Sequence, residues 1–101
     1  MLESVLQTKC MTIAKARGIL CWKVDASAQR GFPDLYLLRD GVSVHVELKT
    51  NTGRLSKLQS RTIEKIKNAG GRVHVVKSVE EFEFIVRRYY PTAAEGDQRD
   101  V

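Results

Sequence analysis

The sequence predicts a small mixed α/β domain in which a β-sheet is flanked by helices and the elements follow the order α-β-β-β-α-β-α. The pair Asp40-Gly41 separates two short runs rich in Val, Leu and Tyr, residues 35–39 and 42–48, which is typical of an antiparallel hairpin. An amphipathic helix over residues 57–69 then leads to another apolar run at 73–76. The second hairpin strand, this helix and this run should form a right-handed βαβ unit with parallel strands.

The remaining elements follow from periodicity and from their end signals. Residues 2–17 carry apolar side chains at three- and four-residue intervals, which predicts a helix that stops at Gly18 before a first strand over residues 19–24. A capping-box pattern at residues 78–81 opens the last helix, and Pro91 ends it. We therefore expect one domain over residues 1–90 and a disordered polar tail over residues 91–101.

Composition favours one basic domain of 101 residues with a formal net charge of +5. Residues 92–101 hold three acidic side chains and one basic side chain, so residues 1–91 carry +7. Such a charge attracts nucleic acid, although a merely soluble cationic surface is an equally open reading of charge alone. Cys10 and Cys21 have neither disulfide nor zinc-site spacing, and no run is long enough for a signal peptide or membrane span, so an intracellular (cytoplasmic) protein is expected.

Two carboxylates and an ammonium are expected to meet at the open end of the hairpin. Strict alternation along residues 42–48 puts Glu47 on the same side as Lys49, and antiparallel pairing brings Asp34 close to Glu47. Like charges at such range are unfavourable unless a cation lies between them, and Mg²⁺ accepts one or two carboxylates together with water and phosphate oxygens. Lys49 has only donors, so it would hold an attacking water and offset negative charge in the transition state.

Gln59 and Glu3 each allow two interpretations. Gln59 lies among apolar positions of its helix, where it either completes a capping box with Ser56 or points at the acidic site. Glu3 lies at the margin of the apolar stripe of the first helix, where an acid is favourable near the helix N-terminus or serves as a further acidic group by the site. The residues alone leave both questions open.

Three cations are candidate phosphate contacts. Arg54 and Lys57 begin a basic ridge on the helix after the hairpin, and Arg30 belongs to the loop that precedes Pro33. Arg30 is equally compatible with an ordinary solvated loop, whereas Arg54 and Lys57, the ridge residues nearest the site, are the favoured contacts.

The pattern Pro33-Asp34 … Glu47-Leu48-Lys49 resembles the PD-(D/E)xK nuclease superfamily. The helix with Glu3, the turn Gly31-x-Pro33-Asp34 and the stretch Thr52-Gly53-Arg54-Leu55-Ser56-x-x-Gln59 make residues 1–90 similar to the virus-type replication-repair nuclease (VRR-NUC) domain. The resemblance implies a DNA-cleaving enzyme that uses Mg²⁺ or Mn²⁺. The resemblance also implies the role of each residue. The metal would be bound by Asp34, Glu47 and the Leu48 backbone carbonyl. Lys49 would hold the water, and the site would be shaped by Glu3 and Gln59.

The resemblance also implies a substrate class. VRR-NUC domains that stand alone are associated with phage and bacterial genomes and with cleavage of branched DNA such as four-way (Holliday) junctions. One active site per chain then implies a homodimer for symmetric cutting of two strands, without a membrane or a small-molecule cofactor. The rival interpretations are a non-catalytic nucleic-acid-binding module of the same fold and a nuclease for flap, duplex or RNA substrates.

Overall fold

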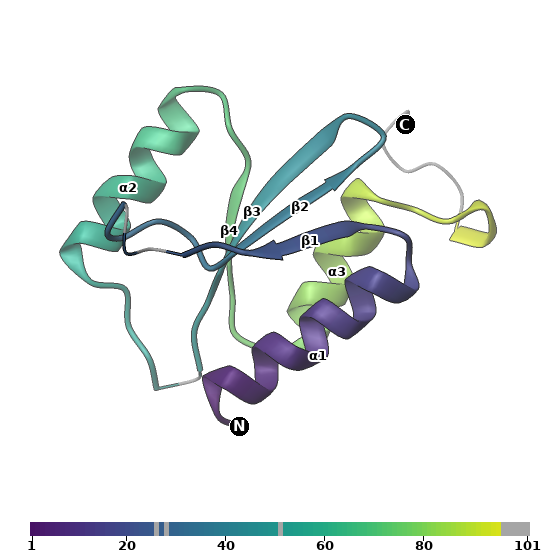
Figure 1. Ribbon diagram of the computed structural model, residues 1–101, viewed down its shortest axis with the longest axis horizontal. Coiled ribbons are helices and arrows are strands. Elements are labelled where there is room, and N and C mark those ends of the chain that lie inside the picture. The colour runs from purple at the N-terminus through teal and green to yellow at the C-terminus, as the bar shows by residue number, and fades with distance from the viewer. Residues whose placement is uncertain (26, 28, 51, 96–101) are drawn as a thin grey trace.

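The computed structural model describes residues 1–25, 27, 29–50 and 52–95 (Figure 1). Its elements confirm the predicted order α-β-β-β-α-β-α, with a short 3-10 helix added near the C-terminus. They are α1 (Glu3–Ala16), β1 (Leu20–Lys23), β2 (Leu35–Arg39), β3 (Val42–Leu48), α2 (Lys57–Asn68), β4 (Val73–Val76), α3 (Val79–Tyr89) and η1 (Ala93–Glu95). None of the helices in these ranges combines the length and apolar character needed to cross a membrane.

The four strands form one mixed sheet in the order β1-β2-β3-β4. The first two pairings are antiparallel and the last, between β3 and β4, is parallel, as the hairpin and the βαβ unit predict. At the hairpin turn Asp40 has φ of 52° and Gly41 has φ of 79°. Positive φ at both central residues is the turn geometry that matches the twist of paired strands, so the turn fixes Arg39 opposite Val42.

The two faces of the sheet carry different side chains and are covered by different helices. One face carries fully buried apolar side chains from β2 and β3 and packs against α1 and α3, which lie together on one side of the sheet in Figure 1. This core includes Leu37, Val44 and Val46 from the strands with Leu6 and Phe82 from the helices. The other face is covered only in part by α2, and this face carries the acidic side chains.

The C-terminal segment differs from the predicted tail at its start. Residues 93–95 form η1, and the Glu95 carboxylate pairs with the Arg17 guanidinium, which also donates to the Tyr90 carbonyl at 3.0 Å. Periodicity cannot reveal this contact, because it joins residues at opposite ends of the chain. The rest of the predicted tail, residues 96–101, lies outside the described residues, and the domain boundary at residue 90 stays a prediction.

Candidate active site

Asp34 and Glu47 face each other across the hairpin. Leu35 is paired with Val46, so the same register continued by one residue puts Asp34 opposite Glu47. The N–H groups of His45 and Lys49 donate to the carbonyls of Arg72, just before β4, and Val76, at the end of β4, at 2.8 and 3.0 Å, which turns the backbone groups of Glu47 away from β2. Opposed residues of this non-hydrogen-bonded kind hold their side chains closest together, with Cα atoms about 4.5 Å apart. Two carboxylates therefore share one spot on the face that α2 partly covers.

A hydrogen bond at the end of the ladder fixes the Asp34 side chain. Continuing the register by two residues makes Pro33 the partner of Leu48, but proline has no N–H to donate. The Leu48 N–H donates instead to Asp34 Oδ2 at 2.8 Å. The Leu48 carbonyl receives no donor from Pro33, so it is suited to face a cation beside the two carboxylates.

The Glu47 carboxylate is buried and electrostatically unfavourable. Glu47 is 1% exposed, and burial together with the negative charge of Asp34 raises its pKa to about 7, although Lys49 acts in the opposite direction. Lys49 Nζ lies 3.5 Å from Glu47 Oε2, and this ammonium is itself mostly buried. One lysine thus offsets only part of the charge that two carboxylates would carry.

Gln59 performs both of the roles that the sequence left open. Its Oε1 accepts from the Ser56 N–H at 2.9 Å, and its own N–H donates to Ser56 Oγ at 3.0 Å, which completes the capping box. Its Nε2 donates to Glu47 Oε2 at 3.0 Å. A single amide therefore connects the first turn of α2 to the carboxylate on β3. Although the side chain is half-buried, both its oxygen and its nitrogen have hydrogen-bond partners.

The other predicted residues lie in the open. Arg30, Arg54 and Lys57 are exposed, as contacts to a large polyanion must be. Glu3 is exposed in the first turn of α1, and the described residues contain no group of three or more His, Cys, Asp or Glu side chains placed to share a metal ion. Glu3 therefore does not join Asp34 and Glu47 in one cluster here, and its role in shaping the site stays a prediction.

A basic pocket adjoins Lys49 and adds a residue that the sequence did not single out. It encloses about 750 Å³, and its lining comprises Lys49, Thr52, Gly53, Arg54, Leu55, Val75 and Lys77. Lys77 directly follows β4, and the parallel pairing of Leu48 with Val76 brings Lys77 beside Lys49. The predicted βαβ unit already contained this signal, because parallel strands end at the same edge of a sheet.

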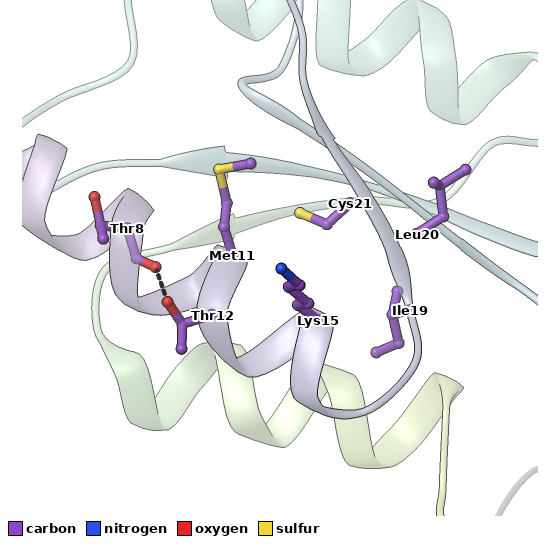
Figure 2. A pocket seen from close by; sticks show the side chains of 7 residues that line it. All are labelled: Thr8, Met11, Thr12, Lys15, Ile19, Leu20 and Cys21. Atoms are coloured by element: carbon purple, nitrogen blue, oxygen red, sulfur yellow. Dashed lines mark hydrogen bonds between the residues drawn. The ribbon is translucent and has the colours of Figure 1, made fainter.

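A second pocket, of about 440 Å³, lies between α1 and β1, with Met11, Lys15, Ile19 and Cys21 among its lining residues (Figure 2). Burial raises the pKa of the Cys21 thiol to about 11, so this cysteine is a neutral thiol and a poor nucleophile. Cys21 pairs with Leu37 on the core face of the sheet, whereas Asp34 and Glu47 belong to the opposite face. This pocket is therefore separate from the acidic site.

The donor set fits a hard divalent cation. Mg²⁺ and Mn²⁺ prefer oxygen ligands, and Mg²⁺ in particular takes one or two carboxylates and fills its other positions with water and phosphate oxygens. Asp34, Glu47 and the Leu48 carbonyl supply such a set. The pKa of Glu47 is raised by burial and by the negative charge of Asp34, and a cation between the two carboxylates would favour their ionised forms. The residues present thus match the metal that the sequence pattern implies.

Comparisons with known proteins bear on the family and the fold of this chain. The family model of the VRR-NUC domain matches residues 4–80. One solved structure described as a VRR-NUC domain superposes with a TM-score of 0.78 at 29% sequence identity, covering 87% of this chain and 97% of its own. Another, described as a VRR-NUC domain protein, has a TM-score of 0.76 at 19% identity and covers 96% of this chain and 92% of its own. No curated protein is significantly similar to the chain in sequence. The match over most of the chain shows that this protein belongs to the VRR-NUC family, a family of nuclease domains of the PD-(D/E)xK type.

Proposed function

We propose that the protein is a metal-dependent endonuclease that hydrolyses DNA phosphodiester bonds with Mg²⁺ or Mn²⁺. The observation that carries this proposal is the meeting of Asp34, Glu47 and Lys49 at one end of the hairpin, on the face of the sheet that α2 partly covers. Asp34, Glu47 and the Leu48 carbonyl would hold the ion. When bound, such an ion lowers the pKa of a coordinated water and stabilises negative charge on phosphate oxygens.

The chain's own groups divide the remaining work. The Lys49 ammonium, 3.5 Å from Glu47, has three donors, one of which orients a water while its charge offsets the charge that develops on the phosphate. Gln59 keeps the Glu47 carboxylate in one orientation by donating to Oε2 at 3.0 Å. Asp34 is held by the Leu48 N–H, so both carboxylates are positioned before a substrate arrives.

The surroundings of the site suit a nucleic-acid backbone. Lys49, Arg54 and Lys77 contribute three positive charges to the adjoining pocket, and Arg30 and Lys57 are exposed on neighbouring segments. Phosphate contacts by Lys and Arg supply most of the affinity for DNA and make it depend on salt. These cations would guide a strand across the end of β3.

We further propose that the substrate is branched DNA, such as a four-way junction, and that the enzyme acts as a homodimer. The resemblance to stand-alone VRR-NUC domains supports this substrate. Within residues 1–25, 27, 29–50 and 52–95 we assign one such carboxylate pair, and symmetric cutting of two strands would then take two chains related by a twofold axis.

The test compares cleavage of four-way junction, flap, duplex and single-stranded DNA and of RNA at matched salt. We expect Mg²⁺-dependent or Mn²⁺-dependent cleavage that is fastest on branched DNA and is lost in Asp34→Ala, Glu47→Ala and Lys49→Ala, while DNA binding is largely retained. Lys65→Ala, which removes an exposed cation from α2, is the matched control and should cleave normally.

Three results would contradict the proposal. Near-wild-type turnover by Lys49→Ala would show that the role of the lysine is misassigned. DNA cleavage that continues in the presence of a chelator would show that the reaction does not depend on a metal ion. Tight binding without cleavage in either metal would identify a non-catalytic binding module.

A further inference from the structure

The most exposed aromatic side chain of the sheet belongs to its edge strand. Trp22 in β1 is 61% exposed, although an aromatic residue within a strand pattern suggests packing in the core or at the sheet edge. Trp22 pairs with Tyr36, which in turn pairs with His45, so the three side chains form a row across β1, β2 and β3. We call these three residues the aromatic row.

The aromatic row lies on the same face as the acidic pair. Tyr36 is two residues from Asp34, and His45 is two residues from Glu47, and alternate residues of a strand share a face. Two residues along a strand span about 7 Å, and neighbouring strands are about 4.8 Å apart. Trp22 is therefore within reach of a nucleotide close to a phosphodiester held at Asp34 and Glu47.

The row is packed at its inner end and open at its outer end. The His45 ring lies 5.2 Å from the ring of Tyr36, and 5.2 Å from that of Phe32 in an edge-to-face arrangement. Trp22, at 61% exposure, is the end of the row most open to solvent, whereas Tyr36 and His45 are half-buried. Beside it on this face, Leu20 is 41% exposed, and Figure 2 shows its side chain directed away from α1.

The size of this surface suits one planar ring better than a protein partner. A tryptophan presents up to about 250 Å² of surface, so at 61% exposure Trp22 offers about 150 Å². A stable protein interface takes about 800 Å² from each partner. A nucleobase stacked on one indole needs only the smaller area, and the positive charge of the domain attracts the strand that carries it.

We propose that Trp22 stacks on an unpaired base of the DNA strand whose phosphodiester lies at Asp34 and Glu47. This inference rests on the proposed nuclease function and specifies its substrate. A base inside a continuous duplex is paired and already stacked on both sides, so it reaches an aromatic side chain only by leaving the stack. Among branched substrates, the favoured ones therefore carry unpaired nucleotides next to the cleaved bond, and a fully paired four-way junction supplies such a base only when one leaves its stack at the branch point.

Trp22 is the only tryptophan of the chain, so its fluorescence reports on this contact directly. The probe is a deoxythymidine 12-mer, compared with a blunt 12-base-pair duplex at matched salt and with a chelator present to prevent cleavage. We expect the single strand to quench the emission and the duplex to change it little. Trp22→Ala should weaken single-strand binding about 5- to 150-fold, measured by anisotropy of a labelled strand, and Trp22→Phe should restore most of it.

Phe84→Ala is the matched control, because Phe84 is 63% exposed on α3, the helix that packs against the other face. It should bind the single strand like the wild type, and thermal unfolding should show that all three variants are folded. Unchanged single-strand affinity in Trp22→Ala would overturn the inference. A dimer that Trp22→Ala converts to a monomer, with emission that depends on protein concentration, would also overturn it by assigning the surface to a second copy.

The inference and the proposed function fail separately. If quenching is seen but no DNA is cut in Mg²⁺ or Mn²⁺, the stacking site stands and the nuclease proposal falls. If DNA with unpaired nucleotides beside the cleaved bond is cut as fast by Trp22→Ala as by the wild type, and is bound as tightly, the nuclease stands and the stacking site falls.

Discussion

Replacing Glu47 with glutamine should stabilise the metal-free protein at alkaline pH and change little at acidic pH. In the folded state burial and Asp34 raise the pKa of Glu47 from 4.5 to about 7. Between these values the folded protein holds a proton that the unfolded chain has lost, so its stability decreases as the pH rises. Above pH 7 the folded protein carries the whole penalty of the ionised side chain, and Glu47→Gln removes that penalty.

The expected size follows from the pKa. Moving a carboxyl pKa from 4.5 to about 7 corresponds to about 3 kcal/mol at pH 8. Glutamine resembles the protonated acid in shape, and its carbonyl oxygen can still accept from Gln59 Nε2. A gain of this size should raise the melting temperature of a domain of about 100 residues by more than about 10 °C.

The assay is urea unfolding of both proteins in chelator at pH 4 and pH 8. Glu64→Gln, which alters an exposed acid on α2, is the control and should behave like the wild type at both values. At pH 8, Mg²⁺ should stabilise the wild type and have a much smaller effect on Glu47→Gln, because a neutral side chain is a poor ligand for a hard cation. Equal destabilisation by Glu47→Gln at both pH values would refute the reasoning, because it would show that the ionised carboxylate is not strained.

Four further substitutions test other parts of the structure. Ser56→Ala removes the helix cap, so it should lower the free energy of unfolding in urea by about 1 kcal/mol and retain turnover. Gln59→Glu keeps the cap but loses the N–H donor to Glu47, so it should lose turnover in a cleavage assay. Gly31→Ala should destabilise by about 2–4 kcal/mol, because Gly31 has φ of +84° and an added Cβ would lie 2.8 Å from Leu58 Cγ. The ionised Glu95 carboxylate, whose pKa the hydrogen bond from Arg17 lowers to about 2, stabilises the fold fully above pH 4.5 and progressively less as the pH falls toward 2. Glu95→Gln should remove this contribution. Acid titration of both proteins, followed by circular dichroism, should therefore show a smaller loss of stability between pH 4.5 and 2 in the variant.

Local chemistry made the acidic pair predictable. Asp40-Gly41 is a strong signal for a two-residue turn, and such a turn leaves only one register for the strands on either side. Once the register is set, Asp34 must lie opposite Glu47, and alternation puts Lys49 on the same face as Glu47. The sequence also predicts the parallel β4, which explains why Lys77 reaches the edge where Lys49 lies.

Contacts that join distant segments were not predictable in this way. The sequence offers Gln59 a local cap and a distant carboxylate as alternatives, but an amide has two ends and the structure uses both. The sequence leaves Trp22 as either a core or a sheet-edge residue, because strand composition does not distinguish an edge strand from a central one, and the structure places it in the edge strand β1. The pairing of Arg17 with Glu95 depends on where two chain ends meet in space, and helix or strand periodicity carries no such information.

The alternation along β3 explains how a small domain can hold an unfavourable carboxylate pair. Val44, Val46 and Leu48 point into the core and are fully buried, so the apolar core contacts of this strand lie on one face. His45 and Glu47 point to the other face, where α2 covers the sheet only in part. The electrostatic penalty of an ionised Glu47 therefore removes no apolar contact from the core, and a bound cation would offset this penalty without moving the core. A one-residue slip in register would reverse both faces at once, so the Asp40-Gly41 turn protects the core and the site together.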